Sequence, residues 1–152
     1  MTRMGLVHDE RVPLFSFEGR SPAISPSAWI APTATLVGDR EQRVAGPGHE
    51  VGEGATVGHL CVVHGAVIGA EALIGNGATI LDGVTVGKRA LVAAGCTVPP
   101  GMVIPDDMLA VGVPARIAGE VAGGARRWVQ ANPQVYRDLA RRHAAGARIV
   151  SE

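Results

Sequence analysis

A repeat of six residues constrains this chain more than any other feature of its sequence. Apolar anchors recur at this spacing in two sets: Ile24, Ile30 and Leu36, and then Val51, Val57, Val63, Ile68, Ile74, Ile80, Val86, Val92, Val98 and Ile104. Only the step from Val63 to Ile68 in the second set is five residues. Six residues make about 1.7 turns of an α-helix, so the anchors would scatter around its surface. Short strands joined by corners instead place every anchor inside a stack of coils, which predicts a parallel β-helix of hexapeptide repeats.

Small or medium-sized residues reinforce this pattern, because one follows most anchors after four residues. They are Ala28, Ala34, Ala55, Cys61, Val67, Ala72, Ala78, Val84, Ala90, Cys96 and Met102. Aromatic residues make up only 3% of the chain, so Val, Ile, Leu and Ala must fill the core. Three hexapeptides close a coil, and coils stack about 4.8 Å apart. We therefore expect Cys61 and Cys96 to lie two coils apart, reduced and buried.

The pattern predicts a β-helix domain over residues 1–120 and a C-terminal helical extension over 121–152 that packs on it. The step from Leu36 to Val51 breaks the period, and residues 39–48 are predicted to form a loop. Residues 112–116 end the stack, and two helical pieces are expected at 126–131 and 133–143. Asn132 would cap the second piece, and Trp128 would anchor the first. A stack this short is expected to rely on association.

Charge and hydropathy exclude several classes of function. The formal net charge is zero, which gives no electrostatic case for binding nucleic acid or an anionic membrane. No apolar run approaches the roughly 20 residues of a membrane span. Residues 1–10 show no signal-peptide core, so a cytoplasmic protein is expected.

Two histidines, His59 and His64, carry the candidate chemistry. They lie five residues apart on consecutive repeats and can both point outward, as half of a zinc site would. Surface histidines that bind nothing are the commoner alternative. Asp82 follows His64 by eighteen residues and Asn76 follows His59 by seventeen, so each should stack one coil further along. A carboxylate there can fix the tautomer of an imidazole, although Asp82 with Gly83 can also be a simple corner turn.

The run from residue 57 onward resembles the γ-class carbonic anhydrase-like family. The motifs that carry the resemblance are Val57-Gly58-His59, Val63-His64-Gly65, Ile74-Gly75-Asn76-Gly77-Ala78, Leu81-Asp82-Gly83 and the ending Gly112-Val113-Pro114-Ala115-Arg116. The opening, from Pro13-Leu14-Phe15 through Ala28-Trp29-Ile30, also matches the start of such proteins, so the resemblance covers about residues 13–120. It implies a left-handed β-helix and a homotrimer. It also implies a zinc ion between subunits, with one histidine from one subunit and two from its neighbour. His59 and His64 match two of these ligands, with Asp82 and Asn76 around them.

One departure from the family weakens this assignment. The family carries its first metal histidine, an Arg-x-Asp and a Gln-Asp in a stretch that has no counterpart here. His49 could supply the third ligand only if its loop folds towards the site. Zinc is the expected metal, with iron or cobalt as alternatives.

Three functions therefore remain open. The first is zinc-dependent, reversible hydration of CO2 to bicarbonate, with doubtful activity because a ligand is missing. The second is a non-catalytic trimeric scaffold or small-ligand-binding protein. The third is a CoA-dependent acyltransferase or thioesterase with His59 or His64 as general base.

Overall fold

The computed structural model of the protein describes residues 12–17, 19–38 and 49–146. These residues form two compact units. One unit comprises the described residues within 1–41 and 135–152, and the other comprises those within 42–134. The loop expected at 39–48 lies outside the described residues.

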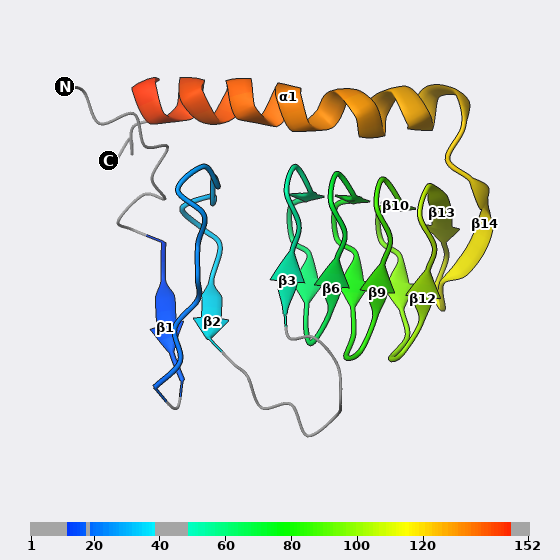
Figure 1. The fold of residues 1–152 in the computed structure, drawn as a ribbon, viewed down its shortest axis with the longest axis horizontal. Helices are drawn as coiled ribbons and strands as arrows, with labels where there is room; N and C mark the ends of the chain where they lie inside the picture. The colour runs from blue at the N-terminus through cyan, green and yellow to red at the C-terminus, as the bar shows by residue number, and fades with distance from the viewer. Residues whose placement is uncertain (1–11, 18, 39–48, 147–152) are drawn as a thin grey trace, which may run out of the picture. The chain divides into compact units, whose positions relative to one another are not determined.

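The second unit is a parallel β-helix with three sheets, which confirms the fold expected from the repeat (Figure 1). One sheet has the strand order β14-β13-β10-β7-β4, the next β11-β8-β5, and the third β12-β9-β6-β3. The strands are β3 (Glu50–Val51), β4 (Thr56–Val57), β5 (Val62–Val63), β6 (Val67–Ile68), β7 (Leu73–Ile74), β8 (Thr79–Ile80), β9 (Thr85–Val86), β10 (Leu91–Val92), β11 (Thr97–Val98), β12 (Val103–Ile104), β13 (Met108–Val111) and β14 (Arg116–Glu120). We call the turn between two consecutive strands of a coil a corner.

The anchors of the repeat form the core of this unit. Stacked anchors pair in register, for example Val63 with Ile80 and Ile80 with Val98. The anchors from Ile68 to Ile104 are buried together with small residues such as Ala78 and Ala90. Val51 and Val57, in the first described coil, are 56% and 40% exposed, because no described strand pairs with the outer edge of β3 or β4.

The two cysteines confirm the register of the coils. Cys61 and Cys96 are both free thiols, and they flank Ala78 in the small-residue position before β5, β8 and β11. Cys96 is buried, and burial raises the pKa of its thiol. Cys61 is only half-buried, unlike the expectation, and its thiol donates to the carbonyl oxygen of Gly75 at 3.1 Å.

The stack ends where the sequence predicts. Strand β13 pairs with β10 in parallel and with β14 in antiparallel, so the chain reverses at residues 112–115. Gly112 has a φ of 96°, a left-handed conformation that a residue with a side chain rarely adopts.

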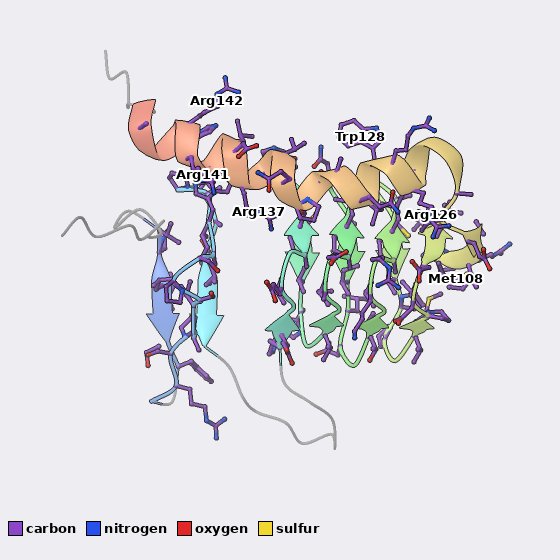
Figure 2. All side chains as sticks on the ribbon, turned by 45° about the horizontal axis from the view of Figure 1, so that its top comes forward. Met108, Arg126, Trp128, Arg137, Arg141 and Arg142 are labelled. Carbon is purple, nitrogen blue, oxygen red and sulfur yellow. The ribbon has the colours of Figure 1, made fainter. Side chains whose placement is uncertain are left out.

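A single helix, α1 (Gly123–Gly146), follows the strands, so the prediction of two helical pieces is wrong. Pro133 lies inside the helix and removes one main-chain hydrogen bond. Val129 and Asn132 are both buried, and the helix continues through Asn132, so Asn132 is a buried helical residue and not a cap. Trp128 does not anchor the helix either: it is 63% exposed and lies on the side away from the strands (Figure 2).

The first unit contains β1 (Leu14–Ser16) and β2 (Leu36–Gly38), which pair in parallel with Leu14 opposite Leu36. The last turns of α1 belong to this unit, and the ring centroids of Trp29 and His143 lie 5.6 Å apart. Ala140 is buried, whereas Val135 is 49% exposed. Within the described residues, no helix is both long and apolar enough to cross a membrane.

Candidate functional site

His64 and Asp82 occupy successive levels of one corner of the β-helix. His64 follows β5, and Asp82 comes shortly after β8, the strand that pairs with β5. The Nδ1 atom of His64 lies 2.9 Å from Oδ1 of Asp82, and both side chains are about two-thirds exposed. An ionised carboxylate can only accept a hydrogen bond, so Nδ1 of His64 must donate. The Nε2 atom of a neutral His64 then carries a lone pair and can act as a base or a ligand.

His49 lies beside this pair. Its Nδ1 atom accepts the main-chain N–H of Gly65 at 3.0 Å, and its ring centroid lies 6.0 Å from that of His64. The two rings are nearly perpendicular, with an interplanar angle of 86°. The structure thus brings three of the predicted residues together, namely His49, His64 and Asp82.

His59 lies at a different corner, before β5, whereas His64 follows that strand. The main-chain N–H of His59 donates to Oδ1 of Asn76 at 2.9 Å, which confirms the predicted stacking of these two residues. The side chain of Asn76 therefore holds the backbone of His59 and leaves its exposed imidazole outside that contact. The neighbouring Leu60 has a φ of 58° and is 92% exposed.

Glycines give both corners the room that their polar contacts need. A Cβ atom on Gly65 would lie 2.5 Å from Oδ1 of Asp82, and Gly65 has a φ of 61°. A Cβ atom on Gly58 would collide with Oδ1 of Asn76. In the sequence, Gly58 and Gly65 were named only as parts of the γ-class motifs. Their second role is to leave room for the side chains of Asp82 and Asn76. The sequence signal for it was the position of each glycine directly next to a histidine.

The donor set of one chain does not fit a zinc ion held by three protein ligands. Among the described residues, no three His, Cys, Asp or Glu side chains gather closely enough to hold a metal. The Nδ1 lone pair of His49 is used by the N–H of Gly65, and Nδ1 of His64 faces Asp82. The side chain of His59 extends from another corner, between β4 and β5. A zinc site would therefore require ligands from a second copy.

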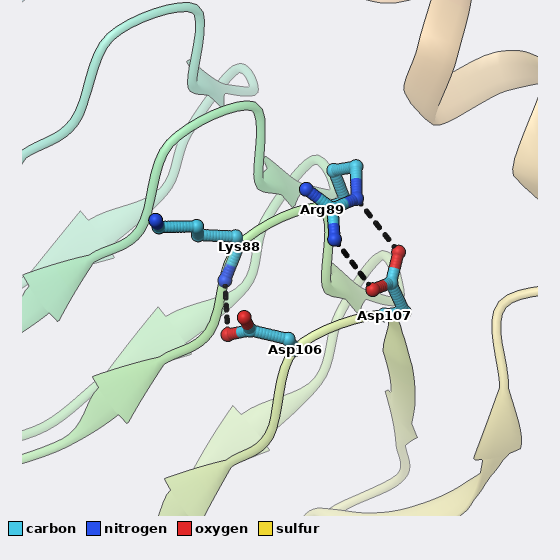
Figure 3. Close-up of polar contacts among 4 residues, drawn as sticks. All are labelled: Lys88, Arg89, Asp106 and Asp107. Carbon is cyan, nitrogen blue, oxygen red and sulfur yellow. Dashed lines mark hydrogen bonds and ion pairs between the residues drawn. The ribbon is translucent and has the colours of Figure 1, made fainter.

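A different corner carries a charged network. Arg89 binds both carboxylate oxygens of Asp107, at 2.8 and 2.7 Å, and the main-chain N–H of Lys88 donates to Oδ1 of Asp106 (Figure 3). The hydrogen bond from Arg89 lowers the pKa of Asp107, and the same bond raises the pKa of Arg89. The adjoining cavity measures only about 10 Å³ and holds at most a water. This corner therefore serves the structure of the stack.

Comparison with known proteins places the chain among the hexapeptide-repeat proteins. Residues 65–100 match the family described as bacterial transferase hexapeptide (six repeats). A hexapeptide transferase family protein from Anaplasma phagocytophilum shares the fold with a TM-score of 0.65 and 21% identity, over 88% of this chain and 99% of the other. A putative acetyltransferase from Bacillus cereus does so with a TM-score of 0.63 and 22% identity, over 90% and 99%.

Relatives with higher sequence identity identify the family within the hexapeptide-repeat proteins. The carnitine operon protein CaiE of Citrobacter koseri is 32% identical over 83% of this chain and 81% of its own length. The CaiE protein of Escherichia coli O1:K1 is 31% identical over 86% and 85%. The chain therefore belongs to the CaiE family of hexapeptide-repeat proteins.

Proposed function

We propose that the protein transfers an acyl group from a CoA thioester to a hydroxyl or amine acceptor, with His64 as the general base. The observation that carries this proposal is the 2.9 Å contact between Nδ1 of His64 and Oδ1 of Asp82. It fixes the tautomer of His64 and directs the basic Nε2 atom away from the carboxylate. Asp82 is the orienting group.

The reaction follows from this geometry. Nε2 of His64 takes the proton of the acceptor while the acceptor oxygen or nitrogen attacks the thioester carbonyl. The tetrahedral intermediate then collapses, the carbon–sulfur bond breaks, and the thiolate leaves. The imidazolium returns its proton to the thiolate, which yields the acylated acceptor and free CoA. Asp82 stabilises the imidazolium in between, because the two side chains then form an ion pair.

The family supports this choice over the carbonic anhydrase reaction. The matched repeat family is described as a transferase family, and both similar folds carry transferase descriptions. A transferase of this kind requires one oriented base in each chain, and the described residues supply one. The non-catalytic alternative, a trimeric scaffold or small-ligand-binding protein, is favoured by no single contact in the structure.

Zinc-dependent hydration of CO2 is the second candidate, and the resemblance of residues 57–65 to the γ-class run favours it. A histidine with Nδ1 on a carboxylate and Nε2 outward has the arrangement of an oriented zinc ligand. His64 meets that description, with His59 of a neighbouring copy as the expected second ligand. Among the described residues, none is placed to supply the third zinc ligand beside His64.

An assay of free CoA thiol tests the proposal. It measures the thiol released from a panel of acyl-CoA donors in the presence of hydroxyl or amine acceptors. We expect turnover by the unmodified protein and a loss of roughly 10²–10⁴-fold in kcat for His64→Ala. Lys88→Ala is the control, because the Lys88 side chain lies at another corner and only its main-chain N–H is used. Zinc-dependent CO2 hydration without thiol release from any donor would favour the second candidate instead.

A further inference from the structure

We infer that His49 is a positioning residue for His64, one that ends the hydrogen-bond column of this corner and is not a metal ligand. The inference rests on the proposed function for its effect on turnover. Its structural part stands on contacts of His49 that no sequence pattern revealed.

The corner of His64 carries a column of main-chain hydrogen bonds. The N–H of Gly101 donates to the carbonyl oxygen of Asp82 at 2.8 Å, and the N–H of Gly83 donates to that of Gly65 at 2.7 Å. Each glycine thus binds a carbonyl one coil earlier. By the same rule the N–H of Gly65 needs an acceptor one coil before it, and it receives the imidazole Nδ1 of His49 at 3.0 Å. A side chain therefore takes the place of the main-chain carbonyl.

His64 consequently has a partner on each side along the stack. Strand β3 pairs with β6, so His49, directly before β3, lies one coil earlier than the corner of His64. Asp82 lies one coil later. The ring of His49 stands perpendicular to that of His64, while its Nδ1 atom holds the residue next to His64 in the chain. Asp82 orients the ring of His64, and His49 fixes the backbone from which that ring extends.

This contact also decides which atoms of His49 remain for other chemistry. Because Nδ1 accepts the N–H of Gly65, a neutral His49 carries its proton on Nε2. That tautomer offers no second lone pair to a metal, since the lone pair on Nδ1 is already in use. The structure thus assigns His49 a different role from the third ligand that its position in the sequence suggested.

Two substitutions separate this role from others. His49→Ala removes the acceptor and leaves the N–H of Gly65 unpaired, whereas His49→Asn offers a side-chain oxygen at a similar reach. We expect a fall of about 10-fold or more in kcat for His49→Ala with little change in KM, because a shift of the base affects the reaction and not substrate binding. His49→Asn should restore most of the rate.

Hydrogen exchange at the Gly65 amide tests the structural part without any turnover. We expect faster exchange in His49→Ala than in the unmodified protein, and near-normal exchange in His49→Asn. Faster modification of His64 by diethyl pyrocarbonate in His49→Ala would support the same conclusion. Unchanged exchange in His49→Ala would overturn the inference, even if the thiol-release assay finds a substrate.

Zinc uptake provides the opposing test. The positioning role predicts that His49→Ala and the unmodified protein take up the same amount of added zinc. A selective loss of zinc in both His49→Ala and His49→Asn would make His49 a ligand and overturn the inference. If no donor is turned over, the proposed transferase function fails, while the exchange and zinc results still decide the role of His49.

Discussion

Oδ1 of Asp82 lies 2.9 Å from Nδ1 of His64, although eighteen residues separate them in the chain. This contact exists because one coil returns the chain to the same corner, as the pairing of β5 with β8 shows. Both side chains stay largely exposed, so a substrate can approach His64 from solvent or from a neighbouring copy.

Asp82→Asn should lower kcat without unfolding the protein. An amide can keep a hydrogen bond to Nδ1 of His64, but it carries no charge to stabilise the imidazolium and no longer enforces one tautomer. The loss should lie within the roughly 10²–10⁴-fold effect of removing the base itself. Thiol release under saturating donor measures it.

Asp106→Asn is the matched control for this change. Asp106 is also a corner carboxylate, and it accepts the main-chain N–H of Lys88 at 2.8 Å, but it does not touch a histidine. The two Asn variants should therefore unfold at similar temperatures and differ in kcat. Equal rates for both would show that Asp82 has no role in the reaction.

Gly65→Ala should lower kcat much more than Gly77→Ala does. Both glycines have a left-handed φ, of 61° and 71°, so an alanine costs each roughly 1–2 kcal/mol in backbone strain. Only at Gly65 does the new Cβ meet the carboxylate of Asp82, whereas nothing lies within 4 Å at Gly77. Thermal unfolding should report the larger loss of stability for Gly65→Ala, because its Cβ would also lie 3.1 Å from the Cα atom of Asp82. Thiol release is therefore compared at a temperature at which both variants stay folded.

The period of the sequence was sufficient to predict the β-helix and the stacking of its corners. The anchors and small residues fix which residues point inward, so the pairs His64–Asp82 and His59–Asn76 follow from counting along the chain. The helix was less predictable. Asn132 and Pro133 read locally as a helix start, but the helix continues through both, and Val129 is buried on the turn before them.

The role of His49 could not be predicted from the sequence, because it depends on how the chain enters the first described coil. Counting from Gly65 places no repeat anchor at His49, so no register could be assigned to it. Only the contact with the N–H of Gly65 reveals that a side chain replaces a main-chain carbonyl there. The same contact uses the Nδ1 lone pair that His49 would otherwise offer to a metal.

Asp107→Asn should destabilise the protein near neutral pH and lose this effect in acid. The hydrogen bond from Arg89 lowers the pKa of Asp107 below its ordinary value of 3.8, so the folded state favours the charged form. That contribution is present above the pKa of the unfolded chain and disappears as the pH falls through the lower folded pKa. Urea unfolding near neutral pH and below about pH 3 measures the difference. The two side chains are half-exposed, at 41% and 43%, so added salt should reduce the effect near neutral pH. An effect independent of pH would contradict this assignment.

The protein should be a homotrimer, as the short stack and the family resemblance lead us to expect. The corners that bear His59 and His64 are expected near the contact, and Leu60, next to His59, is 92% exposed. Leu60→Asn should weaken the trimer while keeping the fold, because asparagine tolerates a left-handed φ better than leucine does. Val103→Asn is the control, since Val103 is also exposed, at 63%, but lies in β12, whereas Leu60 lies in the turn between β4 and β5. Light scattering at micromolar concentration measures the mass, and a monomer in the unmodified protein would refute the prediction.

Zinc should bind weakly, and CO2 hydration should stay near the buffer background even in zinc-loaded protein. In one chain the Nδ1 lone pair of His49 is used by Gly65, and His59 and His64 leave from different corners. Two imidazoles contributed by neighbouring copies leave a tetrahedral site half filled by protein.

The segment that holds the family's first metal histidine, Arg-x-Asp and Gln-Asp has no counterpart in this sequence. A reacting group misplaced by about 1 Å can cost on the order of 10²-fold in rate, so partial ligation would not restore catalysis. Metal analysis after gel filtration and stopped-flow CO2 hydration test both points. Stoichiometric zinc, together with a hydration rate that both His59→Ala and His64→Ala abolish, would make hydration the function of this site in place of acyl transfer.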